Sequence, residues 1–142
     1  MHLLDTNILN ALYLGNSKII NALRHLDDPQ VAITIVTKVE LLRGRLDFLL
    51  KADKGDAILH AQDLLIQTEQ RLSEIEVIHF DINAIAQLER LIANRSLRKS
   101  GRADLLIASI ALANRATLVT RNLKDFQRIP NLRVINWFDF PG

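Results

Sequence analysis

Short apolar runs alternate with longer stretches of helical pattern along the whole chain, and this alternation is the feature that most constrains its fold. The expected strands cover residues 2–4, 31–35, 76–80, 117–120 and 133–136. The segments between them carry apolar residues at helical spacing, as in Ile85, Leu88 and Ile92. Parallel strands need long crossover connections, which are usually helices. The pattern therefore predicts an α/β fold, with three α/β/α layers around a five-stranded parallel sheet.

Length and composition indicate a single globular domain over residues 1–142. Apolar residues make up 49% of the chain, which is ordinary for a folded soluble protein. There is no cysteine, so disulfides, thiolate catalysis and cysteine-ligated zinc are excluded. The sequence has no signal-peptide pattern and no run of the roughly 18 apolar residues that a membrane span needs. We therefore expect a cytoplasmic protein that does not associate with membranes.

The first expected strand runs directly into an acidic residue, Asp5, followed by the small polar residues Thr6 and Asn7. An ionised carboxylate at the end of a buried strand is costly unless something binds it. The N-terminus of the following helix could do so, and so could a metal ion. Asp5 is therefore a candidate both for a helix cap and for a metal ligand.

Further acidic or amide side chains are expected at the same edge of the sheet, because helix N-termini gather at the carboxyl ends of parallel strands. They are Glu40 in the helix after the second strand, Asp104 at the start of an apolar helix over 103–115, and Asn122 and Asp125 after the fourth strand. Neighbouring carboxylates cannot all stay ionised without a counter-charge. Hard divalent cations such as Mg²⁺ or Mn²⁺ supply that charge and prefer oxygen ligands.

Each of these residues also has a purely structural interpretation. Asp5 or Thr6 could simply cap a helix, and Thr37 with Glu40 fits the S/T-x-x-E capping box. Asp104 could favour the positive end of its helix, and the segment 122–125 could form a capped turn. Taken singly, these alternatives stay open. They do not explain why the acids share one edge of the sheet.

Basic residues gather in two places. Arg90, Arg95, Arg98, Lys99 and Arg102 form a run without any acidic residue, and Arg43 and Arg45 form a smaller cluster after Glu40. Such patches suit a polyanion, because phosphate contacts supply most non-specific affinity for nucleic acids. A solvated helix face would give the same pattern.

Five short motifs, in this order, resemble a PIN domain, and more narrowly the VapC-like toxins of bacterial type II toxin–antitoxin pairs. They are LLDTN at 3–7, VTKVEL at 36–41 with Gly44, ADLLIA at 103–108, LVTRN at 118–122 with Asp125 and Phe126, and LRVINW at 132–137. The resemblance covers essentially the whole chain. It implies a metal-dependent endoribonuclease that is usually dimeric and is inhibited by a small antitoxin protein encoded beside it.

The resemblance also implies roles for individual residues. Asp5, Glu40 and Asp104 would be the catalytic acids that bind Mg²⁺ or Mn²⁺. Many family members carry a fourth acid where this chain has Asn122, and Asp125 one helical turn later could add charge. Thr6, Asn7 and Thr120 match polar positions that orient the ligands or a water molecule, and we expect Arg43, Arg98, Lys99 and Arg102 to bind RNA. The expected reaction is hydrolysis of RNA phosphodiester bonds by water activated at the cation.

Other classes of protein fit less well. A phosphate-accepting receiver domain needs an acidic pair after its first strand, and a phosphatase with a nucleophilic Asp needs D-x-D, but Asn stands at position 7. The stronger alternative is a catalytically weak or inactive PIN-like domain that binds RNA or a partner protein. Asn122 is the residue that keeps this alternative open.

Overall fold

The computed structural model describes residues 1–141, and its centre is a five-stranded sheet with the strand order β3-β2-β1-β4-β5. The strands are β1 (His2–Leu4), β2 (Val31–Thr34), β3 (Glu76–Ile78), β4 (Thr117–Val119) and β5 (Arg133–Ile135). Every neighbouring pair is parallel, and in the central strand His2 lies opposite both Val31 and Thr117. The predicted α/β fold with a parallel sheet is confirmed.

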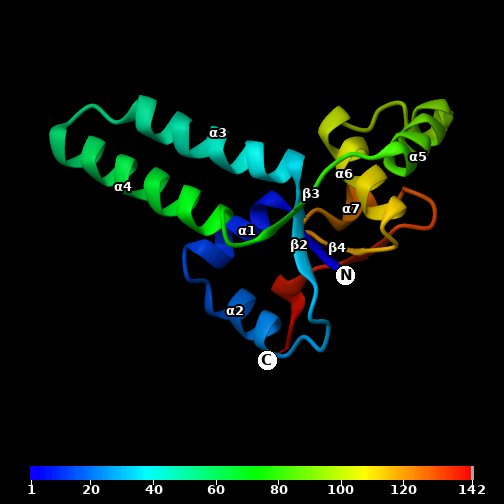
Figure 1. Cartoon of the computed structure of the whole chain (residues 1–142), viewed down its shortest axis with the longest axis horizontal. Coiled ribbons are helices and arrows are strands. Elements are labelled where there is room, and N and C mark those ends of the chain that lie inside the picture. The colour runs from blue at the N-terminus through cyan, green and yellow to red at the C-terminus, as the bar shows by residue number, and fades with distance from the viewer. Residues whose placement is uncertain (142) are drawn as a thin grey trace.

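Helices connect the strands and cover the sheet (Figure 1). They are α1 (Thr6–Tyr13), α2 (Ser17–Arg24), α3 (Ile35–Lys51), α4 (Gly55–Leu72), α5 (Ile82–Ala93), α6 (Arg102–Ala113) and α7 (Leu123–Phe126), with the 3₁₀ turns η1 (Arg95–Leu97) and η2 (Trp137–Asp139). None of the helices in the described part of the chain is both long enough and apolar enough to cross a membrane.

Alternation along the strands divides the core into two apolar layers, one on each face of the sheet. In β1, Leu3 packs into a cluster with α5, α6 and α7, whereas Leu4 packs into a second cluster with α1, α2 and η2. Leu118 and Val119 of β4 divide in the same way. The helix α6 is the most buried of the seven, as its continuous apolar sequence predicts, and its residues Leu105 and Ile107 to Ala111 are buried.

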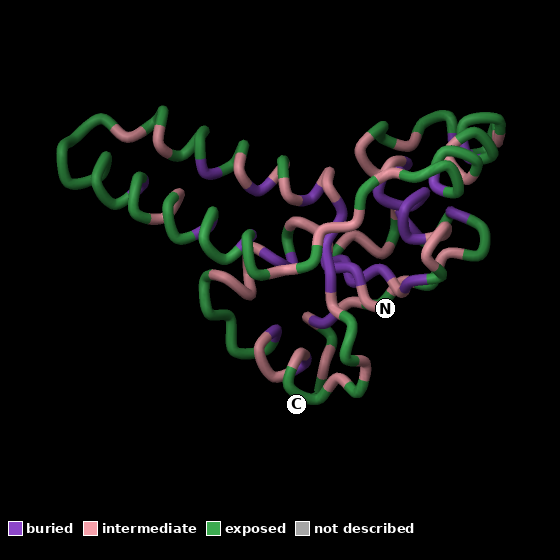
Figure 2. Tube along the Cα trace, in the orientation of Figure 1, coloured by how far each residue is buried: buried purple, intermediate pink, exposed green. Residues whose placement is uncertain are grey.

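The helices α3 and α4 form a long antiparallel pair that projects from the body of the molecule (Figure 1). Their outer turns are largely exposed, as the green sections of the tube in Figure 2 show. One polar contact joins them inside: Arg45 Nε donates to Thr68 Oγ1 at 2.9 Å, and both side chains are buried. The projection is therefore held by packing and this one buried hydrogen bond between the helices.

The start of α3 corrects one of the structural interpretations. The N-cap of α3 is Thr34, whose Oγ1 accepts a hydrogen bond from the backbone N–H of Thr37 at 3.2 Å. Thr37 is thus inside the helix, and the capping box expected between Thr37 and Glu40 is wrong. Since Glu40 is not needed to cap its own helix, its carboxylate is available for contacts with other segments.

Candidate active site

Asp5 lies at the carboxyl edge of the sheet, between the central strands. Its backbone N–H donates to the carbonyl of Val119 at 2.8 Å, so the residue still belongs to the parallel pairing of β1 and β4. Its side chain caps α1, because Oδ1 accepts from the N–H of Thr6 at 2.8 Å. The helix-cap interpretation of Asp5 is therefore correct, and it leaves the second carboxylate oxygen, Oδ2, for other partners.

Thr120 holds that second oxygen. It follows β4 directly and is fully buried, and its Oγ1 donates to Asp5 Oδ2 at 2.8 Å. The same hydroxyl accepts the backbone N–H of Asn122 at 3.0 Å. One hydroxyl thus fixes the Asp5 carboxylate and also the start of the segment that carries Asn122.

Glu40 is attached to the same group of residues through α1. Thr6 Oγ1 donates to Glu40 Oε1 at 2.8 Å, and Glu40 is half-buried on α3. Thr6 therefore serves both acids, with its backbone N–H on Asp5 and its hydroxyl on Glu40. The two carboxylates approach from different helices and are oriented by one residue.

Asp104 is the acid in the least favourable surroundings. It lies in the first turn of α6 and is half-buried, and its carboxylate accepts no hydrogen bond from any protein group in residues 1–141. Burial raises the pKa of its carboxyl group above the usual value, and the negative charges of Asp5, Asp125 and Glu40 raise it further. The electrostatic coupling shows that these four acids, from four separate segments, share one region of the molecule.

Asn122 and Asp125 form a contact of their own beside this group. Asn122 Nδ2 donates to Asp125 Oδ2 at 2.8 Å, across the first turn of α7. The other oxygen of Asp125 lies 3.9 Å from Arg128 in an exposed ion pair, which is a weak interaction. Asn122 is not acidic, but its side chain holds the Asp125 carboxylate beside the other acids.

Among the described residues, no basic side chain forms an ion pair with the central acids. The ion pairs within residues 1–141 involve Asp28 and Asp125, and none involves Asp5, Glu40 or Asp104. In the same part of the chain, no three His, Asp or Glu side chains stand close enough together to hold a metal ion as they are. The atoms available as metal ligands are all oxygens, however, and no ion pair among the described residues offsets the repulsion between the central carboxylates. By its chemistry this set fits a hard divalent cation.

Two of the predicted RNA-binding residues lie beside the acids. Arg43 and Arg102 line a groove of about 540 Å³ together with Glu40 and an apolar floor that includes Val36 and Leu106. Arg98 lines a smaller neighbouring hollow with Arg102, and Lys99 is exposed. The structure thus places Arg43 and Arg102 next to the candidate active site.

Asn7 lines a further pocket, of about 480 Å³, together with Asn10 and Arg121, two residues for which the sequence predicted no role. Asn10 Oδ1 is buried and has no hydrogen-bond partner among the described residues, and the Arg121 guanidinium lies 4.6 Å from the ring centre of Phe138. A signal for both was present, since Asn10 is one helical turn after Asn7 and Arg121 follows Thr120 directly.

The amino-acid sequence is similar to those of known proteins. The sequence matches the PIN domain family over residues 2–132. It is 33% identical to ribonuclease VapC2 of Rickettsia felis, with 96% of this chain and 98% of that protein aligned. It is 27% identical to the tRNA(fMet)-specific endonuclease VapC of Salmonella typhimurium, with 95% and 96% aligned.

A solved structure gives the same result for the fold. The crystal structure of VapBC2 from Rickettsia felis, bound to a DNA fragment from the promoter, contains a chain that superimposes with a TM-score of 0.74 at 32% identity. The alignment covers 96% of this chain and 98% of that one. The similarity therefore extends over the whole domain and includes all segments of the acidic site. This chain belongs to the PIN domain family and, within it, to the VapC group.

Proposed function

We propose that this protein is a divalent-metal-dependent endoribonuclease and the toxin of a toxin–antitoxin pair. The observation that carries the proposal is Asp104, a half-buried carboxylate with no donor among the described protein groups and with three other acids close enough to raise its pKa. Such an arrangement is costly for the protein alone and is typical of a site that binds a cation. The names of the relatives, ribonuclease and tRNA(fMet)-specific endonuclease, support RNA as the substrate.

In this proposal, Asp5, Glu40 and Asp104 hold Mg²⁺ or Mn²⁺, and Asn122 and Asp125 complete the oxygen-rich surroundings. When bound, such a cation lowers the pKa of a water molecule and stabilises negative charge on a phosphodiester. Thr6 and Thr120 fix the orientation of Asp5 and Glu40 through the hydrogen bonds described above. Fixed ligands reduce the reorganisation needed during the reaction.

The basic residues around the acids would place the RNA backbone. Arg43 and Arg102 stand at the groove that contains Glu40, so a phosphate held by them lies beside the acidic cluster. Arg98 and Lys99 extend the positive charge away from the site. Asn7, on the first turn of α1, would contact substrate or water at the other side of Asp5.

Two groups of exposed apolar side chains support the expectation of an antitoxin partner and a second copy of the chain. One group lies on the projecting helices α3 and α4 and includes Leu50, which is 72% exposed. The other lies on α5 and includes Ile82, which is 81% exposed, with Ile85 and Ile92. Exposed apolar patches of this kind mark protein interfaces. The protein would act in the cytoplasm, where its RNA substrate is found.

The test is cleavage of RNA by the purified protein with Mg²⁺ or Mn²⁺ and with a chelator. The initiator tRNA is the first substrate to try, because the Salmonella relative is named for it. Asp5→Asn and Asp104→Asn should abolish cleavage while the protein stays folded. Asp63→Asn is the matched control, since Asp63 is an exposed carboxylate on α4, away from the site.

Calorimetric titration with Mn²⁺ separates the proposed enzyme from an inactive PIN-like domain that only binds RNA or protein. The proposed enzyme binds Mn²⁺ saturably, and Asp5→Asn removes the binding. Cleavage at the wild-type rate by either active-site variant would refute the residue assignment. Absence of saturable Mn²⁺ binding together with absence of cleavage would favour the binding domain.

A further inference from the structure

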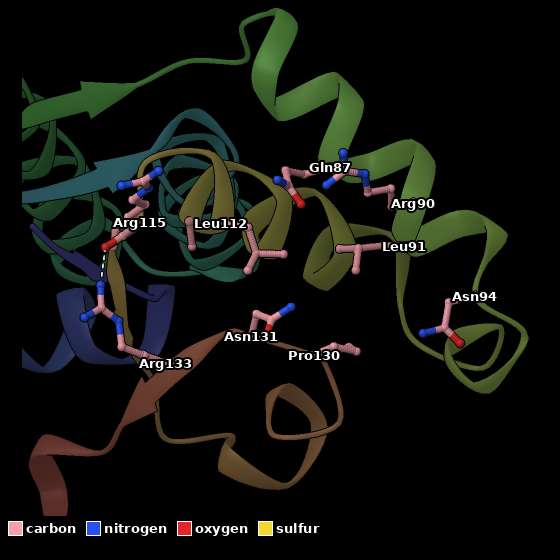
Figure 3. Close-up of a pocket in the computed structure, with 11 residues that line it drawn as sticks. Gln87, Arg90, Leu91, Asn94, Leu112, Arg115, Pro130, Asn131 and Arg133 are labelled. Carbon is pink, nitrogen blue, oxygen red and sulfur yellow. Dashed lines mark hydrogen bonds between the residues drawn. The ribbon is translucent and has the colours of Figure 1, made fainter.

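We propose that a basic pocket at the opposite, amino edge of the sheet binds the phosphate of a nucleotide. The pocket has a volume of about 450 Å³ and lies between the last turns of α5, the end of α6 and the start of β5 (Figure 3). The acidic site lies at the carboxyl edge, so the two are separated by the length of the strands. This inference does not depend on the proposed nuclease activity.

The side chains around this pocket are positive or neutral. It is lined by Gln87, Arg90, Leu91, Asn94, Ala111, Leu112, Arg115, Ala116, Pro130, Asn131 and Arg133. Three of these residues are arginines, three carry side-chain amides, and none is acidic. Figure 3 shows Gln87 and Arg90 on α5 at one side of the pocket, with Pro130, Asn131 and Arg133 on the other. Any ligand in the pocket therefore meets positive charge from both sides.

Most of the polar groups at the pocket are free to bind a ligand. Within residues 1–141, the side chains of Gln87, Arg90, Arg115 and Asn131 take part in no hydrogen bond or ion pair with another protein group. Two lining side chains are engaged: Asn94 Oδ1 accepts from the N–H and the hydroxyl of Ser96, and the Arg133 guanidinium donates to the backbone carbonyl of Arg115. This contact fixes Arg133 at the rim. The arginines are exposed, so a phosphate can reach them without unfolding the site.

The backbone at the pocket adds an independent observation. Arg115 has φ 51° and Asn131 has φ 67°, and no other non-glycine residue in the described part of the chain has a positive φ. Both of them line this one pocket. The left-handed conformation costs a residue other than glycine about 1 kcal/mol, and such residues cluster where a ligand is held. Asn tolerates this conformation well, but Arg does not, so Arg115 is the informative case.

Arg115 occupies the position after a helix end that glycine usually fills. The N–H of Ala116 donates to the carbonyl of Ala111 at 2.9 Å, and the N–H of Arg115 donates to that of Leu112 at 3.2 Å. These two bonds form the Schellman motif, in which the left-handed residue is most often glycine. The helix end needs only the backbone of this residue. Having arginine here therefore places a guanidinium at the pocket that plays no part in ending the helix.

The end of a helix carries partial negative charge, which would oppose an anion. Here three of the last four carbonyls of α6 are already engaged. Ala111 and Leu112 accept the two bonds of the motif, and the carbonyl of Ile110 accepts both the backbone and the side-chain amide of Asn114. The carbonyl of Arg115 is taken by Arg133. The full charges of the arginines therefore dominate the field in the pocket.

Size and polarity indicate the class of ligand. The volume lies within the range of about 300–1,000 Å³ that is usual for small-molecule sites. Leu91, Ala111 and Ala116 are buried and give the pocket an apolar floor. An apolar floor beneath arginines and amides suits a molecule that joins a flat, partly apolar ring to a phosphate. A nucleoside phosphate has this chemistry, either as a free mononucleotide or as an unpaired unit of an RNA strand.

The test is calorimetric titration of the full-length protein with three probes: inorganic phosphate, adenosine 5′-monophosphate and a short single-stranded RNA. Arg90→Ser should weaken binding of the nucleotide about tenfold or more, since one charge-assisted contact is lost. Arg90 is exposed and its side chain makes no hydrogen bond or ion pair with the protein groups of residues 1–141, so the fold should not change. Arg24→Ser on α2 removes the same charge from an exposed position away from the pocket and should leave binding unchanged.

The probes distinguish the possible sources of the phosphate. Tighter binding of the mononucleotide than of RNA, sensitive to Arg90→Ser, supports a free nucleotide as the ligand. Tighter binding of RNA with the same sensitivity supports a strand that reaches across the molecule. The proposal is overturned if none of the probes binds saturably, or if Arg90→Ser and Arg24→Ser weaken binding equally.

Discussion

Thr120→Val tests whether one buried hydroxyl holds the acidic site together. The replacement keeps the shape of the side chain and removes two hydrogen bonds. One runs from Thr120 Oγ1 to Asp5 Oδ2 at 2.8 Å, and the other runs from the N–H of Asn122 to Thr120 Oγ1 at 3.0 Å. Thr120 is fully buried, so water cannot replace its hydroxyl without a rearrangement.

The expected loss in the free energy of unfolding can be estimated from these two hydrogen bonds. A hydrogen bond to a charged acceptor contributes about 1.5–3 kcal/mol, and a buried N–H left without a partner costs about 1–3 kcal/mol. Burying the additional methyl group of valine returns about 1 kcal/mol. The free energy of unfolding should therefore fall by about 2–4 kcal/mol. For a chain of 142 residues this corresponds to a decrease in Tm of about 6–12 °C.

The assay is thermal unfolding followed by circular dichroism, with Thr120→Ser as the matched control. Serine keeps the hydroxyl and both hydrogen bonds, and loses only a methyl group, at a cost of about 1 kcal/mol. RNA cleavage by the valine variant should fall about 10- to 100-fold, because Asp5 loses a partner that orients it. If the valine variant is as stable and as active as the serine variant, the hydroxyl does not hold the site and the reasoning is wrong.

Three further changes test other parts of the structure. Asp104→Asn should stabilise the metal-free protein at neutral pH, because the raised pKa of Asp104 means that folding disfavours its ionised form. In urea denaturation with a chelator present, the free energy of unfolding of Asp104→Asn should exceed that of the wild type above the folded-state pKa. The difference should disappear as the pH falls below that pKa. Asp28→Asn should lower the Tm at neutral pH, since hydrogen bonds from the N-terminal ammonium, the N–H of Gln30 and His2 hold the pKa of Asp28 well below its usual range. That stabilisation is present above the unfolded pKa and is lost as the pH falls through the folded pKa, so the Tm values of the two proteins should converge in acid. Arg45→Met should lower the free energy of unfolding in urea by less than about 1 kcal/mol, or raise it. The reason is that burial lowers the pKa of Arg45 and that its Nη2 has no partner among the described residues. A large loss of stability would contradict this.

The architecture could be predicted from the sequence because it depends on local periodicity. Alternating apolar runs and helical stretches are visible without knowing any contact, and they determine a parallel sheet with helical crossovers. The placement of Asp5, Glu40 and Asp104 at one edge follows from the same reasoning, since the edge of a strand is known once its direction is known. The order of the strands, β3-β2-β1-β4-β5, does not follow, because it depends on long-range packing.

The contacts inside the site could not be predicted, because they join residues far apart in the chain. The family resemblance implies that Thr6 and Thr120 orient the ligands or a water molecule, but it does not say which acid each of them contacts. That Thr6 donates to Glu40, and Thr120 to Asp5, is known only from the structure. The basic run after Arg90 shows the same limit. The sequence presents it as one patch, whereas the structure places Arg90 at the amino edge and Arg102 beside the acids.

The bond between Asp5 and Thr120 has a consequence during synthesis of the protein. The two residues are separated by 115 positions, so the Asp5 carboxylate lacks its second partner until almost the whole chain has left the ribosome. The strand β4, which pairs with β1 at the centre of the sheet, arrives just as late. A nascent chain or a truncated fragment that lacks Thr120 therefore leaves the Asp5 carboxylate with its bond to Thr6 alone. The orientation of Asp5 described above is complete only once β4 has joined the sheet.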